Sequence, residues 1–126
     1  MKYSFLGGLF LFIGVLFGAL ASHALRDQLS ETSMESFQTG VRYLVYHGFA
    51  LLILPSIQEL KQKTKNQIVT LILFGTLLFS GSIFLLATKD LHNLEIGFLG
   101  PITPVGGLLL LSSWGLLTIR LFQNRN

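Results

Sequence analysis

The chain has 126 residues, of which 51% are hydrophobic and 12% charged, and its mean hydropathy is +0.63. A soluble domain carries about 25% charged residues, so this composition indicates a single integral membrane domain. The absence of cysteine excludes a disulfide framework, a thiolate metal site and a cysteine nucleophile. The net charge is +3, and no basic face with interleaved aromatic residues indicates nucleic-acid binding.

The first apolar stretch, residues 4–25, is long enough to cross a membrane. About 20 residues at ~1.5 Å each span a hydrocarbon core of about 30 Å. A cleaved signal peptide is the alternative, because Lys2 fits a basic n-region and residues 19–21 fit a small-x-small cleavage site. The run exceeds the ~7–15 residues of an h-region, so we expect a retained helix. Small residues recur on one face and predict helix packing there, unless glycine is simply common in membrane helices: Gly14, Gly18 and Ser22.

The second predicted helix covers residues 37–57 and follows a polar, acidic segment. Thr32 and Glu35 fit a capping box in that segment, and Ser30 is an alternative N-cap. The first turns of this helix carry side chains that are unusual at membrane depth: Arg42, Tyr43, Tyr46 and His47. Such ionisable groups are costly unless neighbouring helices receive them.

The third and fourth predicted helices cover residues 67–88 and 104–122, which completes an all-α bundle of four transmembrane helices in one domain. The third is interrupted by Ser80, Gly81 and Ser82. Residues 101–104, which include Thr103, open the fourth helix. Two glycines follow this opening segment at once, at positions 106 and 107. We expect the small residues to let helix backbones approach closely: Gly81, Gly106 and Gly107.

The basic residues predict the orientation of the four helices. With four spans, six of them fall on one side of the membrane: Lys2, Lys61, Lys63, Lys65, Arg120 and Arg125. Three fall on the other side: Arg26, Arg42 and Lys89. Because cytoplasmic loops carry the excess of lysine and arginine, we expect both termini in the cytoplasm and a multi-pass protein of the cytoplasmic membrane.

This topology places nearly all of the unusual residues at one depth, in the outer half of the bundle. Burying such groups unpaired in hydrocarbon costs several kcal/mol each. We therefore expect one polar pocket lined from all four helices: His23, Arg42, Tyr43, Tyr46, His47, Ser80, Ser82 and Thr103. Within it, we expect Arg42 to pair with Glu35, or otherwise with Asp27 or Glu31.

Each of these features also has a plainer interpretation. His23 fits a residue that caps a helix C-terminus, and the two tyrosines fit an interfacial aromatic belt. The serines fit packing positions, and His47 fits an ordinary hydrogen bond between helices. Trp114 lies in mid-span, where packing or lipid contact is expected, and His92 stands alone in a loop.

Four motifs occur in order along nearly the whole chain: GALASHAL at 18–25, FQTGVRYLVYHGFALL at 37–52, FSGSIFLLA at 79–87 and ITPVGG at 102–107. Together they resemble the YgdD/YwdK-like small inner-membrane proteins of bacteria, which form a domain-of-unknown-function family. The resemblance implies a four-helix membrane protein and variation at Arg42 and Tyr46. It implies motif positions at His23, Thr39, Gly40, Tyr43, His47, Ser80, Gly81, Ser82, Thr103, Pro104, Gly106 and Gly107.

Three classes of function remain open from the sequence. The pocket could belong to a small channel, carrier or accessory subunit for a proton, ion or small polar solute, since histidine titrates near neutral pH. The chain could instead be a structural or assembly protein, alone in the bilayer, as a homo-oligomer or with other membrane subunits. Two histidines could ligate haem, and Ser80 could pair with His47, but no buried carboxylate accompanies them. We expect no enzyme, no metal and no cofactor.

Overall fold

The computed structural model describes residues 2–125, with only the backbone of Lys2, so the Lys2 side chain that we counted above lies outside the described residues. It is all-helical, and residues 2–125 contain no strand. The four long helices are α1 (Lys2–Ser22), α2 (Glu31–Ile53), α3 (Gln62–Ala87) and α4 (Ile102–Gln123). Three short 3-10 turns lie between them: η1 (Leu54–Ser56), η2 (Lys89–Leu91) and η3 (Gly97–Leu99).

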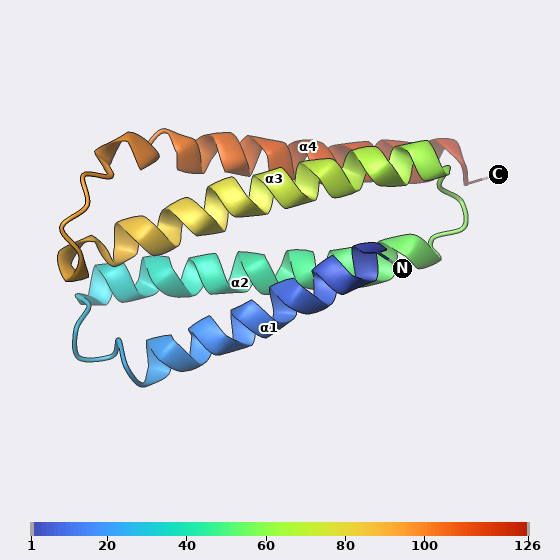
Figure 1. Ribbon diagram of the computed structural model, residues 1–126. Coiled ribbons are helices and arrows are strands. Elements are labelled where there is room, and N and C mark those ends of the chain that lie inside the picture. Colours follow the sequence, from blue (N-terminus) through green and yellow to red (C-terminus); the bar gives the residue numbers. More distant parts are fainter. Residues whose placement is uncertain (1, 126) are drawn as a thin grey trace.

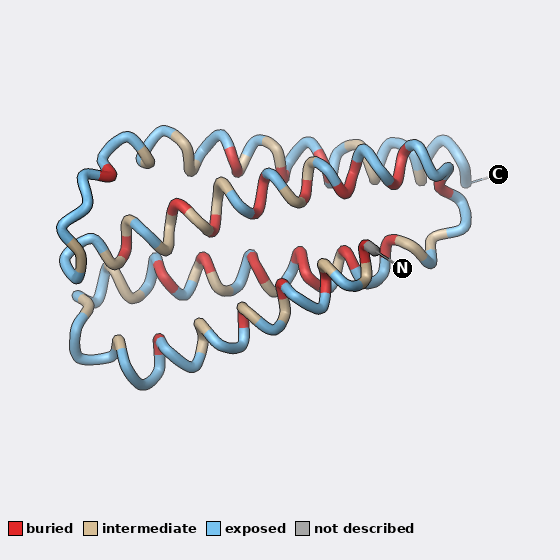
Figure 2. The backbone as a smooth tube through the Cα atoms, viewed as in Figure 1, coloured by how far each residue is buried: buried red, intermediate tan, exposed pale blue. Residues whose placement is uncertain are grey.

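Successive helices lie side by side, so that α1 packs on α2, α2 on α3, and α3 on α4 (Figure 1). One end of this layer holds both termini and the α2–α3 connection, and we call it the terminal end. The opposite end holds the α1–α2 and α3–α4 connections, and we call it the loop end. Most buried residues lie on the faces that neighbouring helices turn toward one another (Figure 2).

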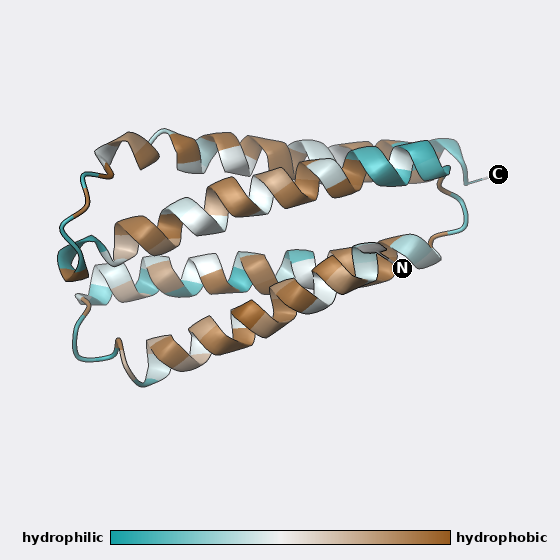
Figure 3. Ribbon diagram, viewed as in Figure 1, coloured by the Kyte–Doolittle hydropathy of each residue, from teal (hydrophilic) through white to brown (hydrophobic). Residues whose placement is uncertain are grey.

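Three stretches are long and apolar enough to cross a membrane: Tyr3–Ser22, Gln62–Ala87 and Gly97–Gln123. They cover nearly all of α1 and the whole of α3 and α4, whose residues are mostly hydrophobic apart from the first turns of α3 (Figure 3). α2 is more polar because it carries Glu31, Glu35 and Arg42, yet it lies inside the layer between α1 and α3. Four membrane crossings therefore stay a prediction, whereas the four-helix architecture is confirmed.

The helix boundaries differ from the predicted spans mainly at polar ends. α1 ends at Ser22, three residues before the predicted limit, and α3 begins at Gln62, five residues before the predicted start. α2 begins at Glu31, because the Ser30 side chain accepts a hydrogen bond from the backbone N–H of Ser33 at 3.1 Å. Of the two alternative caps, the structure thus selects Ser30.

Hydrogen bonds join neighbouring segments at the terminal end. α2 stops before Pro55, and the freed Pro55 carbonyl accepts a hydrogen bond at 2.8 Å from Nζ of the buried Lys65. The Tyr3 hydroxyl donates to Oδ1 of Asn66, which ties α1 to α3. Asn124 donates to the Glu59 carbonyl at 2.8 Å, so the C-terminus meets the α2–α3 connection.

Aromatic packing joins three helices near the loop end. Phe84 of α3 lies between Phe17 of α1 and Phe37 of α2, with ring centroids 4.8 and 5.0 Å away. Its ring also lies against Gly40, where an added Cβ would come within 2.7 Å of it. Because lipid tails are as apolar as these side chains, such close packing is what holds membrane helices together.

Two glycine pairs mark where helix backbones approach most closely. A Cβ on Gly7 of α1 would lie 2.6 Å from the carbonyl oxygen of Gly48 on α2. A Cβ on Gly106 of α4 would meet the backbone nitrogen of Phe79 and would lie 2.8 Å from the carbonyl oxygen of Gly75. Each approach requires the absence of a side chain, so each helix pair depends on its glycines.

Some of the other predicted packing residues contact a neighbouring helix, and others lie at open positions. Gly14 faces α2, where a Cβ would lie 2.6 Å from the Val45 side chain, and Gly18 and Gly107 have ordinary neighbours. A Cβ on Gly81 would meet nothing within 4 Å, and Ser22 is exposed. Gly14 and Gly106 thus lie at close contacts between helices, whereas Gly81 faces open space and Ser22 is exposed.

Candidate functional site: a lateral cavity between α2 and α4

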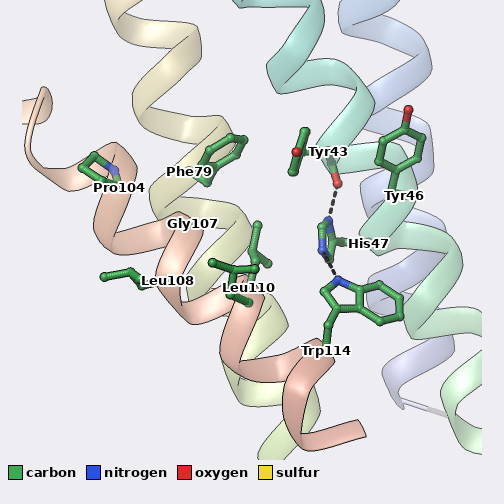
Figure 4. A pocket seen from close by; sticks show the side chains of 10 residues that line it. Tyr43, Tyr46, His47, Phe79, Pro104, Gly107, Leu108, Leu110 and Trp114 are labelled. Carbon is green, nitrogen blue, oxygen red and sulfur yellow. Dashed lines mark hydrogen bonds between the residues drawn. The ribbon is translucent and has the colours of Figure 1, made fainter. Parts of the chain in front are cut away.

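A cavity of about 790 Å³ lies between α2 and α4, with α3 behind it. Figure 4 views it from close by. The lining comes from three helices and is mainly aromatic and aliphatic: Tyr43, Tyr46 and His47 of α2, Phe79 of α3, and Pro104, Gly107, Leu108, Leu110, Leu111 and Trp114 of α4. Its volume is within the range of about 300–1,000 Å³ that is typical of small-molecule pockets.

Helical spacing brings the lining residues of α4 together. Pro104, Gly107, Leu111 and Trp114 follow one another at intervals of three or four residues, so they share one face of the helix. Gly107 adds no side chain to this face, and a Cβ there would lie 3.7 Å from the Phe79 ring. Trp114 is the last of the four in the direction of the terminal end, so it closes the cavity there.

His47 is the one ionisable side chain that is almost fully buried in this wall, with 3% of its surface exposed. Its Nδ1 lies 2.6 Å from the Tyr43 carbonyl oxygen, and its Nε2 lies 3.0 Å from Nε1 of Trp114 (Figure 4). A carbonyl only accepts, so Nδ1 carries the hydrogen; an indole N–H only donates, so Nε2 accepts. These two contacts fix a neutral imidazole in one tautomer and link α2 to α4.

The two tyrosines supply the remaining polar atoms of the lining. The Tyr43 ring lies 4.6 Å from the Phe79 ring and 5.9 Å from the Tyr46 ring, measured between centroids. Neither tyrosine hydroxyl has a hydrogen-bond partner within residues 2–125. Both rings are partly exposed, so their hydroxyls are free to bind a ligand or water.

The structure does not bring all eight predicted pocket residues to this cavity. Three of them line it, namely Tyr43, Tyr46 and His47. Ser80 instead donates to the Gly40 carbonyl at 2.8 Å, which joins α3 to α2. His23 lies in the turn after α1 and is exposed.

Two further predicted members form their own hydrogen bond away from the cavity. The hydroxyls of Ser82 on α3 and Thr103 on α4 lie 2.6 Å apart. Arg42 is exposed and donates to the Thr39 hydroxyl at 2.8 Å. The predicted pairing of Arg42 with an acid is therefore wrong within the described residues, because its partner is the hydroxyl one turn earlier on the same helix.

The arrangement offers binding surfaces rather than a reactive group. Ser80 and His47 are bonded to other partners, so the serine–histidine pair that the sequence left open does not form. His92, expected to stand alone, is half-buried, and its Nε2 lies 3.0 Å from the Leu85 carbonyl oxygen. Within residues 2–125, no three histidine, aspartate or glutamate side chains gather as a metal site.

Trp114 lines the cavity, although it was not among the expected site residues. A tryptophan in mid-span, away from the usual interfacial belt, was the available signal. Its pairing with His47 depends on how α2 and α4 are rotated toward each other, and residue spacing along either helix does not encode that rotation.

The chain is similar to a group of small bacterial membrane proteins. A family model described as "Protein of unknown function (DUF423)" matches residues 17–107. A UPF0382 membrane protein of Staphylococcus haemolyticus is 36% identical over 118 residues, which cover 94% of this chain and 93% of that protein. The UPF0382 membrane protein YwdK of Bacillus subtilis is 29% identical over 117 residues, 90% of each chain. No solved structure matches. The resemblance drawn from the four motifs is thus confirmed.

Proposed function

This chain belongs to the DUF423 family of membrane proteins, and we propose that it is a membrane-embedded binding protein whose lateral cavity takes up the hydrocarbon chain of a bilayer lipid. We place it in the cytoplasmic membrane, with four crossings and both termini inside. The observation that carries the proposal is the cavity of about 790 Å³ between α2 and α4.

The chemistry of the lining favours a hydrocarbon chain over an ion or a polar solute. The polar atoms of His47 and Trp114 already bond to each other and to the backbone, which leaves the Tyr43 and Tyr46 hydroxyls as available polar side-chain atoms of the lining. A charged or strongly polar solute loses its hydration on burial and needs several partners in return. A hydrocarbon chain needs none, and it packs against leucine and aromatic rings.

The position of the cavity favours entry from the bilayer. Leu108 and Leu111 at its edge are 62% and 69% exposed, and they lie in mid-helix rather than at either end of the layer. In a bilayer this side of the molecule meets acyl chains. The second candidate, an assembly protein, would have a helix of a second copy or of another subunit in the same groove.

The lining also supports a binding role rather than catalysis, and we propose that the protein is not an enzyme. The cavity contains aromatic rings, aliphatic side chains and a histidine with both nitrogens engaged. No lining residue pairs a nucleophile with a base, which covalent catalysis requires.

The fluorescence of Trp114 tests the proposal, because it is the only tryptophan in the chain. The purified protein is reconstituted in phosphatidylcholine with a dibrominated acyl chain, and the emission is compared with that in unbrominated lipid. We expect strong quenching in the wild type and weaker quenching in Gly107→Leu, whose side chain projects into the cavity. Gly81→Leu, at an open position outside the cavity, is the matched control and should quench like the wild type.

Two outcomes would contradict the proposal. Equal quenching in all three proteins would mean that bromine reaches Trp114 from the bulk bilayer alone. Weak quenching in the wild type would mean that a protein segment covers the cavity, which favours the assembly role.

A further inference from the structure

A second cavity lies beyond Trp114, toward the terminal end. Its volume is about 150 Å³, and it is lined mainly by apolar side chains, which include Ile53 of α2, Ile72 of α3 and Leu117 of α4. Trp114 lines both this inner cavity and the larger one, whereas His47 lines only the larger. The two cavities therefore follow one another along the helix axes, with the indole between them.

The indole is held in this position by one polar contact. Its N–H donates to Nε2 of His47 at 3.0 Å, and the imidazole is itself held by the Tyr43 carbonyl at 2.6 Å. The Trp114 side chain is otherwise only partly packed, since 42% of its surface is exposed. His47 is thus a positioning residue: it keeps the indole across the path from one cavity to the other.

We propose that Trp114, positioned by His47, sets the length of hydrocarbon chain that the site accepts. This inference rests on the proposed function. The distance along α4 from Pro104 to Trp114 is ten residues, or about 15 Å, and this is the depth open to a chain in front of the indole. Removal of the indole would add the inner cavity as far as Leu117, about 5 Å more.

The two ends of the site differ in a way that orients the chain. Pro104 lies two residues after the start of α4, close to the loop end, where a polar head group can stay near the membrane surface. The inner cavity is lined mainly by isoleucine and leucine, and the hydroxyl of Ser113, its one polar lining side chain besides Trp114, already donates to the Leu110 carbonyl at 2.7 Å, so a head group finds little to bind there. The hydrocarbon tail therefore points toward Trp114.

The inference is tested with a hexadecanoic acid that carries a diazirine on its terminal carbon. The full-length protein in phosphatidylcholine vesicles is irradiated with this probe, with and without excess unlabelled hexadecanoic acid, and the adducts are mapped by mass spectrometry. Adducts that disappear with competitor report bound chains. In the wild type we expect them on residues of the larger cavity, such as Leu110 and Leu111, and not on Ile53 or Leu117.

Substitutions of Trp114 should change how far along the site the labelled adducts extend. In Trp114→Ala, adducts that respond to competitor should appear on Ile53 and Leu117. Trp114→Phe, which keeps a ring across the path, should retain more of the wild-type pattern than the alanine variant. Gly115→Ala, at an open neighbouring position, is the matched control and should label like the wild type.

The possible failures are distinguishable. Competitor-sensitive adducts on Leu117 in the wild type would overturn the role of Trp114 while supporting the lipid site, and this arm needs no variant. An unchanged pattern in a folded Trp114→Ala protein would also overturn it. The absence of competitor-sensitive adducts from both cavities in every protein would overturn the proposed function itself.

Discussion

Replacing Gly106 by alanine should force α3 and α4 apart. The added Cβ would meet the backbone nitrogen of Phe79 and would lie 2.8 Å from the carbonyl oxygen of Gly75. Both are backbone atoms of α3, so no flexible side chain can move aside. The helices must separate by several tenths of an ångström, and the neighbouring contact between Ser82 and Thr103 would lengthen with them.

The expected loss follows from the cost of overpacking. Inserting a methyl group into a well-packed interface costs about 1–3 kcal/mol, and the backbone location of the clash places Gly106→Ala at the upper part of that range. Gly115→Ala on the same helix is the matched control, because its Cβ would meet nothing within 4 Å. There the gain in helix propensity, up to about 1 kcal/mol, should leave stability unchanged or raised.

The assay is reversible unfolding from mild detergent into sodium dodecyl sulfate, followed by circular dichroism. The free energy of unfolding should fall in Gly106→Ala and should not fall in Gly115→Ala. If both variants have the wild-type value, the close approach of α3 and α4 at Gly106 does not exist and the packing described here is incorrect.

Three further predictions concern the site, the core and the topology. A double-mutant cycle of His47→Leu and Trp114→Phe should give a coupling energy of about 0.6 kcal/mol, and up to ~1.7, as found for hydrogen bonds between membrane helices; strictly additive losses would exclude the bond. Thr76→Val should raise the free energy of unfolding by about 1–3 kcal/mol, because Oγ1 of the fully buried Thr76 lacks a hydrogen-bond partner within the described residues; a loss of stability would reveal a partner. Lys63→Cys and Asn93→Cys, at exposed positions at opposite ends of the layer, should be labelled by an impermeant reagent from the cytoplasm and from outside, respectively; labelling of both from one side would reject the proposed topology.

Helix number and order could be predicted from the sequence, whereas helix ends could not. Hydropathy marks the part of a helix that lies in hydrocarbon, but backbone hydrogen bonds continue through polar residues. Gln62 and the residues that follow it begin α3 although they are hydrophilic, and Glu31 begins α2 for the same reason. Capping by Ser30, which is a local interaction, was within the alternatives that the sequence offered.

Tyr43, Tyr46 and His47 line the cavity, but the sequence did not show which of the other expected residues would join them. Helical rise places residues at a level in the membrane, and it does not say toward which neighbour each one is turned. Ser80 turns to Gly40 and Ser82 to Thr103, while Tyr43 turns to the cavity. Only the packing of the helices fixes these rotations.

Arg42 illustrates the limit of reasoning from sequence proximity. Glu35 was the nearest acid toward the helix start, but seven residues of helix separate the two by about 10 Å along the axis. Thr39 is three residues away on the same face, which is the spacing at which helical side chains meet. The guanidinium accordingly bonds to the Thr39 hydroxyl.

The sequence also did not show which glycines lie at close contacts between helices. Gly81 and Gly106 look alike in the sequence, since each stands beside another small residue. Gly106 faces the backbone of α3, whereas Gly81 faces open space. Gly7, Gly48 and Gly75 were not singled out, although each lies at a close approach.

An experimental structure of the protein in a lipid nanodisc tests the central claim most directly. We predict elongated density between α2 and α4 that begins near Pro104, runs beside Leu108 and Leu111, and ends against the Trp114 indole. A helix of a second copy or of another subunit in this groove, or a collapsed groove with α2 packed directly on α4, would contradict the proposal that the cavity holds a lipid chain.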